Sequence, residues 1–176
     1  KGKEMYYPRY YDAKLAEEKN KLLKPGRVLI VYGPRRAGKT TLLQRYIQNF
    51  KGKVFYGVGE DRVLHDIFAS QSVARIRSAF AGYDLIVIDE AQAIDKIGLG
   101  LKLLVDHLSN AKVIASGSSS FELSAQAGEP LTGRKRTILL YPLAIMELIN
   151  IWGAMEIYQR VEEFLLYGLY PEIVLE

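Results

Sequence analysis

The 176-residue sequence predicts an α/β fold in which helices cover both faces of a five-stranded parallel sheet. Two observations carry this prediction. Apolar, strand-like runs alternate with helix-like segments, and this alternation is typical of parallel strands joined by crossover helices. In addition, the run 84–89, DLIVID, has four consecutive apolar residues, as expected for a central strand that is buried on both faces.

The elements are expected in the following order. A leading helix over 10–24 ends before Pro25, because the residue that precedes a proline disfavours the helical conformation. The strands are expected at 27–32, 53–58, 84–89, 112–117 and 136–141, and the helices between them at about 39–50, 62–81, 95–109 and 119–127.

The pattern changes after Pro142, where two helical stretches follow that end at Gly153 and Gly168. We therefore expect a core of residues 1–141, which includes the leading helix, and a small helical segment of residues 142–176. This helical segment is expected to be the start of a lid or of a second domain, so that the sequence is a piece of a longer protein.

The composition excludes several classes of site and location. The chain has no cysteine, which excludes disulfides and thiolate metal sites, and its two histidines, His65 and His107, are too few for a zinc site. No apolar run approaches the roughly 18 residues that span a bilayer. The basic, aromatic N-terminus lacks the apolar middle of a signal peptide, so we expect a cytoplasmic protein without a membrane partner.

Charge is unevenly distributed along the chain. Residues 1–53 hold fourteen lysines and arginines against four acidic residues, whereas the remainder holds ten against sixteen. A basic first third would face the phosphates of a nucleotide or of DNA, and the alternative is a solvated helix face that carries lysines.

The stretch GPRRAGKTTLL, which follows the first strand, matches the phosphate-binding P-loop pattern GxxxxGK[ST] in full. Backbone amides of such a loop, together with the N-terminal end of the next helix, form a cradle for anions. The residues expected to surround the phosphates of ATP or ADP are Gly33, Pro34, Arg35, Arg36, Ala37, Gly38, Lys39, Thr40 and Thr41.

Three of these loop residues have specific expected roles. Lys39 would reach the β- and γ-phosphates, the Thr40 hydroxyl would hold Mg²⁺, and Thr41 would donate to the α-phosphate. Arg35 and Arg36 occupy variable positions and would contact phosphates, a neighbouring subunit or only solvent.

The stretch DLIVIDEAQ places Asp89 and Glu90 at the carboxyl end of the central strand, where open α/β sheets bind their ligands. Asp89 is expected to bind Mg²⁺ through a water, and Glu90 to polarise the water that attacks the phosphate. The second carboxylate favours ATP hydrolysis. The alternative is an acidic pair that caps the next helix.

A serine and two arginines later in the chain are further candidates for the nucleotide site. Ser116, at the tip of the strand KVIASG, would sense the γ-phosphate or orient water, whereas Ser119 or Ser120 would cap the following helix; the alternative is that all these serines are turn and cap residues. Arg134 would stabilise transition-state charge in its own subunit or in a neighbour, with Arg136 as a competitor, or it would lie in a charged turn.

An aromatic cluster precedes the first strand. One of Tyr6, Tyr7, Tyr10 and Tyr11 would stack on the adenine, or these residues would anchor the leading helix to the core, the interpretation that we favour.

Taken together, GPRRAGKTTLL, VIDEAQ, IASGSSS, LTGRKRTILLYPLAIMEL and YGLYPEIV resemble the archaeal and bacterial AAA+-type P-loop ATPases. The resemblance covers the chain from about residue 9 onward. It implies a P-loop three-layer sandwich with an additional strand, in which 112–116 lies between the P-loop strand and the strand of the acidic motif. It also implies Ser116 as the sensor, Arg134 as a candidate arginine finger, and a further C-terminal domain, whereas Arg160 is an unanchored candidate for a second sensor.

The expected function is therefore Mg²⁺-dependent ATP hydrolysis coupled to conformational change, with a nucleotide, a second copy of the chain or its own C-terminal domain as partners. One alternative is a nucleotide-dependent switch or scaffold with little turnover, which associates with DNA. A small-molecule P-loop kinase is a further alternative, although no acceptor pocket is visible in the sequence.

Overall fold

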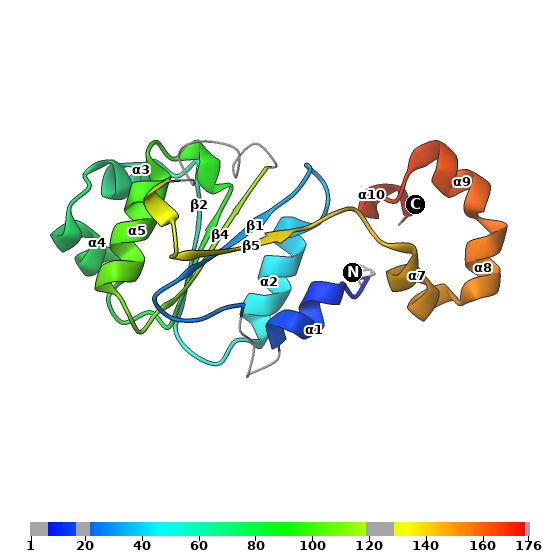
Figure 1. Cartoon of the computed structure of the whole chain (residues 1–176), viewed down its shortest axis with the longest axis horizontal. Coiled ribbons are helices and arrows are strands. Elements are labelled where there is room, and N and C mark those ends of the chain that lie inside the picture. The colour runs from blue at the N-terminus through cyan, green and yellow to red at the C-terminus, as the bar shows by residue number, and fades with distance from the viewer. Residues whose placement is uncertain (1–6, 17–21, 119–128, 175–176) are drawn as a thin grey trace, which may run out of the picture.

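The computed structural model describes residues 7–16, 22–118 and 129–174, and a sheet of five parallel strands forms its centre (Figure 1). The strands are β1 (Val28–Tyr32), β2 (Val54–Val58), β3 (Leu85–Asp89), β4 (Lys112–Gly117) and β5 (Lys135–Leu139). Their order is β2-β3-β4-β1-β5, and every pairing is parallel. The predicted parallel sheet is confirmed, and so is the position of β4 between the P-loop strand and the strand of the acidic motif.

Helices form a layer on each face of this sheet. Alternate residues of β1 point to opposite faces: Val28 and Ile30 belong to one apolar cluster, and Leu29 and Val31 belong to the other. The first cluster includes side chains of α3 (Arg62–Ala69), α4 (Val73–Phe80) and α5 (Ile97–His107), and the second includes those of α1 (Tyr10–Ala16) and α2 (Lys39–Asn49). Two one-turn 3₁₀ helices, η1 (Ala91–Ala93) and η2 (Glu129–Leu131), lie in the connections. The three-layer sandwich is thereby confirmed.

The single helix expected over 62–81 is wrong, because the chain forms the two helices α3 and α4 there. The Ser70 hydroxyl donates to the carbonyl of Ile67 and accepts from the amide of Ser72, and Gln71 adopts a left-handed conformation with φ 49°. Ser72 then accepts a hydrogen bond from Arg75 and caps α4. Local side-chain bonds of serine compete with the helical ladder at this point, which ends one helix and begins the next.

One further expectation differs from the structure, and another is not tested by it. The leading helix, α1, is described only to Ala16, and residues 22–24 are not helical. The helix expected over 119–127, with Ser119 and Ser120, lies outside the described residues.

The helical segment consists of four short helices at one end of the molecule (Figure 1). They are α7 (Ile145–Trp152), α8 (Ala154–Gln159), α9 (Val161–Tyr167) and α10 (Pro171–Val174). The second expected helix is divided at Arg160, whose backbone leaves the helical region at φ −98°, ψ 7°. The amide of Leu143 donates to the carbonyl of Leu169 at 2.8 Å, which joins the two ends of the segment.

A small apolar cluster holds the helical segment together, and the N-terminal stretch contributes to it. Tyr7 is buried with Leu148 and Phe164, and its ring meets that of Trp152 edge-on at 5.7 Å. Trp152 also stacks on Phe164 at 6.4 Å and lies 4.7 Å from the Arg160 guanidinium. The N-terminal stretch therefore packs on the helical segment as well as on the sheet.

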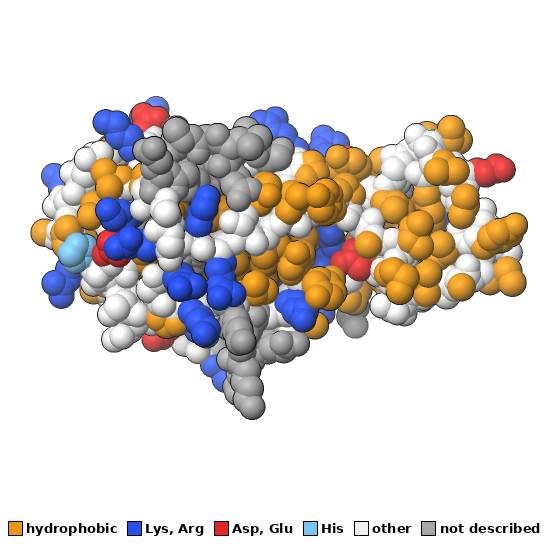
Figure 2. Space-filling model, viewed as in Figure 1, with side chains coloured by type: hydrophobic (Ala, Val, Ile, Leu, Met, Phe, Trp, Pro, Cys, Tyr) orange, Lys and Arg blue, Asp and Glu red, His pale blue; other side chains and the backbone are white. Residues whose placement is uncertain are grey.

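The surface differs between the two ends of the molecule. Figure 2 shows lysine and arginine side chains over the sheet core and mainly apolar side chains over the helical segment. Met146, Met155, Tyr158, Leu165 and Leu166 are each more than 70% exposed. None of the helices in the described ranges has the length and apolar character needed to traverse a bilayer.

Candidate functional site

The loop between β1 and α2 lies at the carboxyl edge of the sheet, and two of its positions require glycine. A Cβ atom on Gly33 would lie 2.0 Å from the carbonyl oxygen of Leu140. Gly38 has φ 91°, in the left-handed region that glycine adopts without strain. The glycines therefore allow the loop to turn tightly against the end of β5 and to enter α2.

Lys39 lies at the start of α2 and folds back over the loop. Its ammonium donates to the carbonyl oxygens of Gly33, at 3.0 Å, and Pro34, at 2.9 Å. The residue is 5% exposed, and burial lowers the pKa of its ammonium, while the nearby carboxylates of Glu90 and Asp89 act in the opposite direction. An ammonium that donates to two neutral carbonyls can exchange these partners for an incoming anion.

Asp89 is the centre of the polar cluster beside the loop. The Thr40 hydroxyl donates to its Oδ2 at 2.7 Å. Its Oδ1 accepts from the Ser116 hydroxyl and, at 3.1 Å, from the amide of Glu90. The structure thus brings Thr40, Asp89 and Ser116 together, because β4 lies beside both β1 and β3.

Tyr56 on β2 also belongs to this cluster, although no motif in the sequence pointed to it. Its hydroxyl donates to Oδ2 of Asp89 at 3.1 Å. Burial, followed by the charge and hydrogen bond of Asp89, raises the pKa of Tyr56 to about 12, so the phenol is a protonated donor at neutral pH. Only the pairing of β2 with β3, in which Tyr56 lies beside Val87, brings this side chain to the site.

Glu90 occupies a left-handed turn with φ 50°, directly after β3. The Gln92 amide nitrogen donates to Glu90 Oε2, and the Gln92 amide oxygen accepts from the backbone amide of Ser118 at 3.3 Å. A Cβ atom on Gly59 would lie 2.1 Å from the Glu90 carbonyl oxygen. Gln92 and Gly59, neither of which was predicted from the sequence, therefore fix the side chain and the backbone of Glu90.

A pocket of about 610 Å³ opens between the loop, the acidic motif and α10. It is lined by Arg35, Arg36, Gly38, Lys39, Thr40, Thr41, Glu60, Glu90, Gln92, Pro171 and Glu172. Arg36 Nη1 donates to both carboxylate oxygens of Glu172 at 2.8 Å. The helical segment therefore contributes to the pocket, which its position late in the sequence did not indicate.

Arg134 lies at the opposite edge of the sheet from this pocket. Its carbonyl accepts from the amide of Val28, the first residue of β1, and its guanidinium pairs with Asp106 at 2.6 Å. Five strand residues at about 3.3 Å each separate this position from the carboxyl edge. The expectation that Arg134 reaches the nucleotide of its own chain is corrected here: a residue that precedes a parallel strand lies at the amino edge, as does Arg136, which pairs with Leu29. A contribution of Arg134 to a neighbouring subunit stays a prediction.

The aromatic cluster lies away from the pocket lining. Tyr7 packs on Trp152, Tyr11 packs against the apolar cluster beneath α2, and Tyr10 is 61% exposed. These positions support anchoring rather than adenine stacking, and Tyr6 lies outside the described residues. Arg160 pairs with Glu156 at 2.9 Å and does not line the pocket.

Comparison with known proteins agrees with this geometry. Residues 25–149, well over half of the chain, match the family model described as "AAA domain". The chain belongs to the AAA domain family. The match includes the phosphate loop, the acidic motif, β4 and β5 of this AAA domain, and it confirms the resemblance to AAA+-type P-loop ATPases.

Two individual proteins are similar to this AAA domain, each at less than 25% sequence identity. An uncharacterized protein of Haemophilus influenzae is 24% identical over 168 residues, which cover 84% of this chain and 40% of that protein. The crystal structure of Pif1 helicase from Candida albicans superposes with a TM-score of 0.55 at 13% identity, covering 91% of this chain and 44% of the helicase. The helicase supports the P-loop fold alone, and the AAA domain spans less than half the length of both proteins.

Proposed function

We propose that this AAA domain binds ATP together with Mg²⁺ and hydrolyses it, and that the cycle changes the contacts of the domain with a client or a further domain. The observation that carries this proposal is that Lys39, Thr40 and Glu90 line one pocket beside the phosphate loop, with the buried Asp89 hydrogen-bonded to Thr40. An ammonium, a hydroxyl and two carboxylates are the groups that phosphoryl transfer to water requires.

The oxygen donors of Thr40 and Asp89 fit Mg²⁺. The two oxygens are 2.7 Å apart, and Thr40 lines the pocket. Mg²⁺ is commonly held by one or two carboxylates together with substrate phosphates. No group of three or more histidine, cysteine or acidic side chains that could hold a metal exists among the described residues, so phosphate oxygens and water would complete the coordination. When bound, the cation would neutralise negative charge on the phosphates.

The chain's own residues have distinct roles in this proposal. Lys39 exchanges its carbonyl partners for phosphate oxygens. Glu90 orients and polarises the attacking water, and Ser116 keeps Asp89 in place through its hydrogen bond. General-base assistance of this kind is worth about 10²–10⁴-fold in rate.

Calorimetry and phosphate release on the purified chain test the proposal. Lys39→Ala should lose ADP binding in the presence of Mg²⁺, whereas Glu90→Gln should keep binding and lose hydrolysis by about 10²-fold or more. Lys51→Ala and Glu163→Gln, at exposed positions outside the pocket, are the matched controls. Hydrolysis by Glu90→Gln at the parental rate would remove Glu90 from its proposed role, and the absence of any ADP binding by the parent would overturn the proposal.

A nucleotide-dependent switch with little turnover is the second candidate, and one contact favours it. Gln92 already occupies Oε2 of Glu90, which restrains the carboxylate that would activate water. If the Gln92→Ala variant releases free phosphate from ATP and the parent does not, this result would support the interpretation as a switch with little turnover. Formation of a phosphorylated acceptor instead of free phosphate would identify a kinase.

A further inference from the structure

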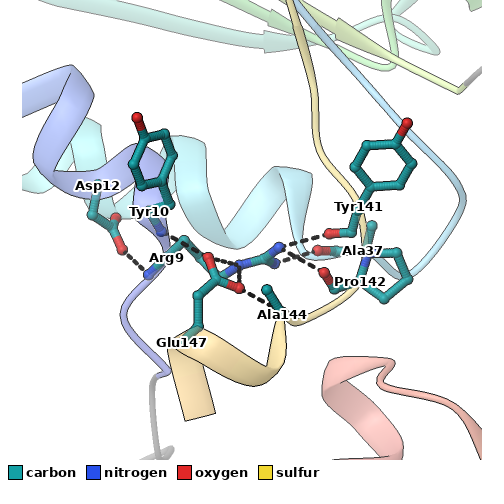
Figure 3. A network of polar contacts seen from close by, with 8 residues as sticks. All are labelled: Arg9, Tyr10, Asp12, Ala37, Tyr141, Pro142, Ala144 and Glu147. Atoms are coloured by element: carbon teal, nitrogen blue, oxygen red, sulfur yellow. Dashed lines mark hydrogen bonds and ion pairs between the residues drawn. The ribbon is translucent and has the colours of Figure 1, made fainter. Parts of the chain in front are cut away.

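We propose that Arg9 is a positioning residue that fixes the phosphate loop and links it to the helical segment. The inference rests on the proposed nucleotide binding and adds to it a residue outside the P-loop motif. Figure 3 shows Arg9 between the loop and the start of α7, with its guanidinium directed at both.

Every nitrogen of the Arg9 guanidinium has an acceptor. Nη1 donates to the carbonyl of Ala37 at 2.7 Å, Nη2 to the carbonyls of Tyr141 at 2.6 Å and Pro142 at 3.2 Å, and Nε to both oxygens of Glu147 at 3.2 Å. The side chain is only 7% exposed. A charged group this deeply buried is retained only with its partners in place, so its geometry is fixed by the fold.

The contact with Ala37 acts on the phosphate loop itself. In a trans peptide the carbonyl of Ala37 and the amide of Gly38 point in opposite directions. By holding this carbonyl, Arg9 fixes the direction of the Gly38 amide, and Gly38 lines the pocket. A donor that is already aimed does not have to reorganise when a phosphate arrives, which strengthens binding.

The contact with Glu147 ties the same guanidinium to α7. The Glu147 carboxylate also accepts from the backbone amides of Tyr10 at 2.7 Å and Ala144 at 2.9 Å, and its side chain is 12% exposed. The ion pair therefore joins the N-terminal stretch to the first turn of the helical segment. Because the loop and α7 share one rigid connector, a ligand that orders the loop also orders the segment, and the linkage acts in both directions.

A second ion pair between the loop and the helical segment is weaker. Arg36 and Glu172 meet at 2.8 Å, but their side chains are 73% and 46% exposed. Exposed pairs contribute little because water screens them. The buried Arg9–Glu147 pair is thus the main connection.

The test compares Arg9→Lys with Glu147→Gln. Lysine keeps the charge but cannot reach the carbonyl of Ala37 and Glu147 together, so ADP binding with Mg²⁺ should weaken about tenfold, the effect of one lost hydrogen bond to a charged group. Glu147→Gln keeps Arg9 and its bond to Ala37 and changes only the link to α7, so its affinity for ADP should fall by less than that of Arg9→Lys, although its melting temperature falls.

Two further readouts separate positioning from a purely structural role. In NMR spectra, the resonance of the Gly38 amide proton should shift downfield on ADP binding in the parent, and the shift should be smaller in Arg9→Lys. Amides of α7 should gain protection from hydrogen exchange on ADP binding in the parent but not in Arg9→Lys. The double variant Arg9→Met with Glu147→Leu removes both buried charges and should bind ADP about tenfold more weakly while remaining folded.

The outcomes are distinct. Parental ADP affinity in Arg9→Lys or in the double variant would overturn the inference, and so would equal losses of affinity in Arg9→Lys and Glu147→Gln. A lack of ADP-dependent protection at α7 in the parent would overturn the linkage. If the parent itself binds no ADP, both the proposed function and this inference are contradicted.

Discussion

Asp89 receives hydrogen bonds from parts of the chain that are far apart in sequence. Thr40 at the start of α2, Tyr56 on β2, Ser116 on β4 and the adjacent amide of Glu90 all donate to its two oxygens. Such partners fix the orientation of a carboxylate before a cation arrives. The carboxylate is therefore held in one orientation by the sheet as a whole.

Tyr56→Phe tests the contribution of the least expected of these donors. The substitution keeps the ring and removes the hydroxyl that bonds to Asp89 Oδ2. We expect the Mg²⁺ concentration that half-saturates ATP hydrolysis to rise about tenfold, as is typical when an outer partner of a metal ligand is lost. Tyr158→Phe, on the exposed surface of α8, is the control. An unchanged Mg²⁺ dependence would show that Tyr56 does not position Asp89.

The sequence was sufficient for some of these residues and not for others. The positions of Lys39, Thr40 and Asp89 beside the loop could be predicted, because each has a fixed offset from a glycine or from a buried strand, whereas their roles stay predictions. Tyr56 could not, because its role depends on which strand pairs with β3. Nothing local in the sequence indicates that a residue as distant as Glu172 lines the same pocket.

At the scale of elements, α5 approaches α3 closely through a glycine. A Cβ atom on Gly100 would lie 2.4 Å from a ring carbon of Phe68, which is fully buried. The absence of a side chain in the middle of α5 thus allows the aromatic ring of the neighbouring helix to fit.

Gly100→Ala should therefore destabilise the protein, although alanine is the better helix former. Helix propensity favours alanine by about 1 kcal/mol, while overpacking of a rigid buried ring costs about 1–3 kcal/mol. We expect a net loss of up to about 2 kcal/mol in the free energy of unfolding, measured by urea denaturation. Adding Phe68→Leu should make the combined loss smaller than the sum of the single losses. A gain in stability on Gly100→Ala would contradict the packing argument.

Element types were easier to predict than element ends. The five strands follow from apolar runs that alternate with polar segments, and all five exist within one or two residues of their expected bounds. The predictions of two long helices were wrong, because local interactions interrupt each of them. At Ser70–Ser72, hydrogen bonds of serine hydroxyls end one helix before the next begins. At Arg160 the backbone leaves the helical region between α8 and α9. Periodicity alone does not register such short interruptions.

At the scale of the whole molecule, the sheet core and the helical segment differ in charge. Figure 2 shows lysine and arginine side chains over the sheet core, whereas the sequence of residues 141–176 holds six glutamates and a single arginine. A nucleic-acid partner would therefore meet the core rather than the helical segment.

If DNA is a partner, its binding should depend steeply on salt. Phosphate contacts release counterions, so we expect affinity for a duplex, measured by fluorescence anisotropy, to fall by about 10³-fold or more between 50 and 200 mM salt if about six phosphates are contacted. Lys24→Glu, in the basic first third, should reduce this slope, whereas Glu163→Gln, on the helical segment, should leave it nearly unchanged. Undetectable binding at low salt, or a flat salt dependence, would contradict a role for DNA.

The packing around Trp152 has a practical consequence. It is the sole tryptophan of the chain, and it touches Tyr7 from the N-terminal stretch, two residues before Arg9. Its indole is also bracketed by an aromatic ring and a guanidinium, both of which influence emission. The protein thus carries an intrinsic optical label where its N-terminal stretch meets the helical segment, and selective excitation of the indole would follow motion there in real time without any attached dye.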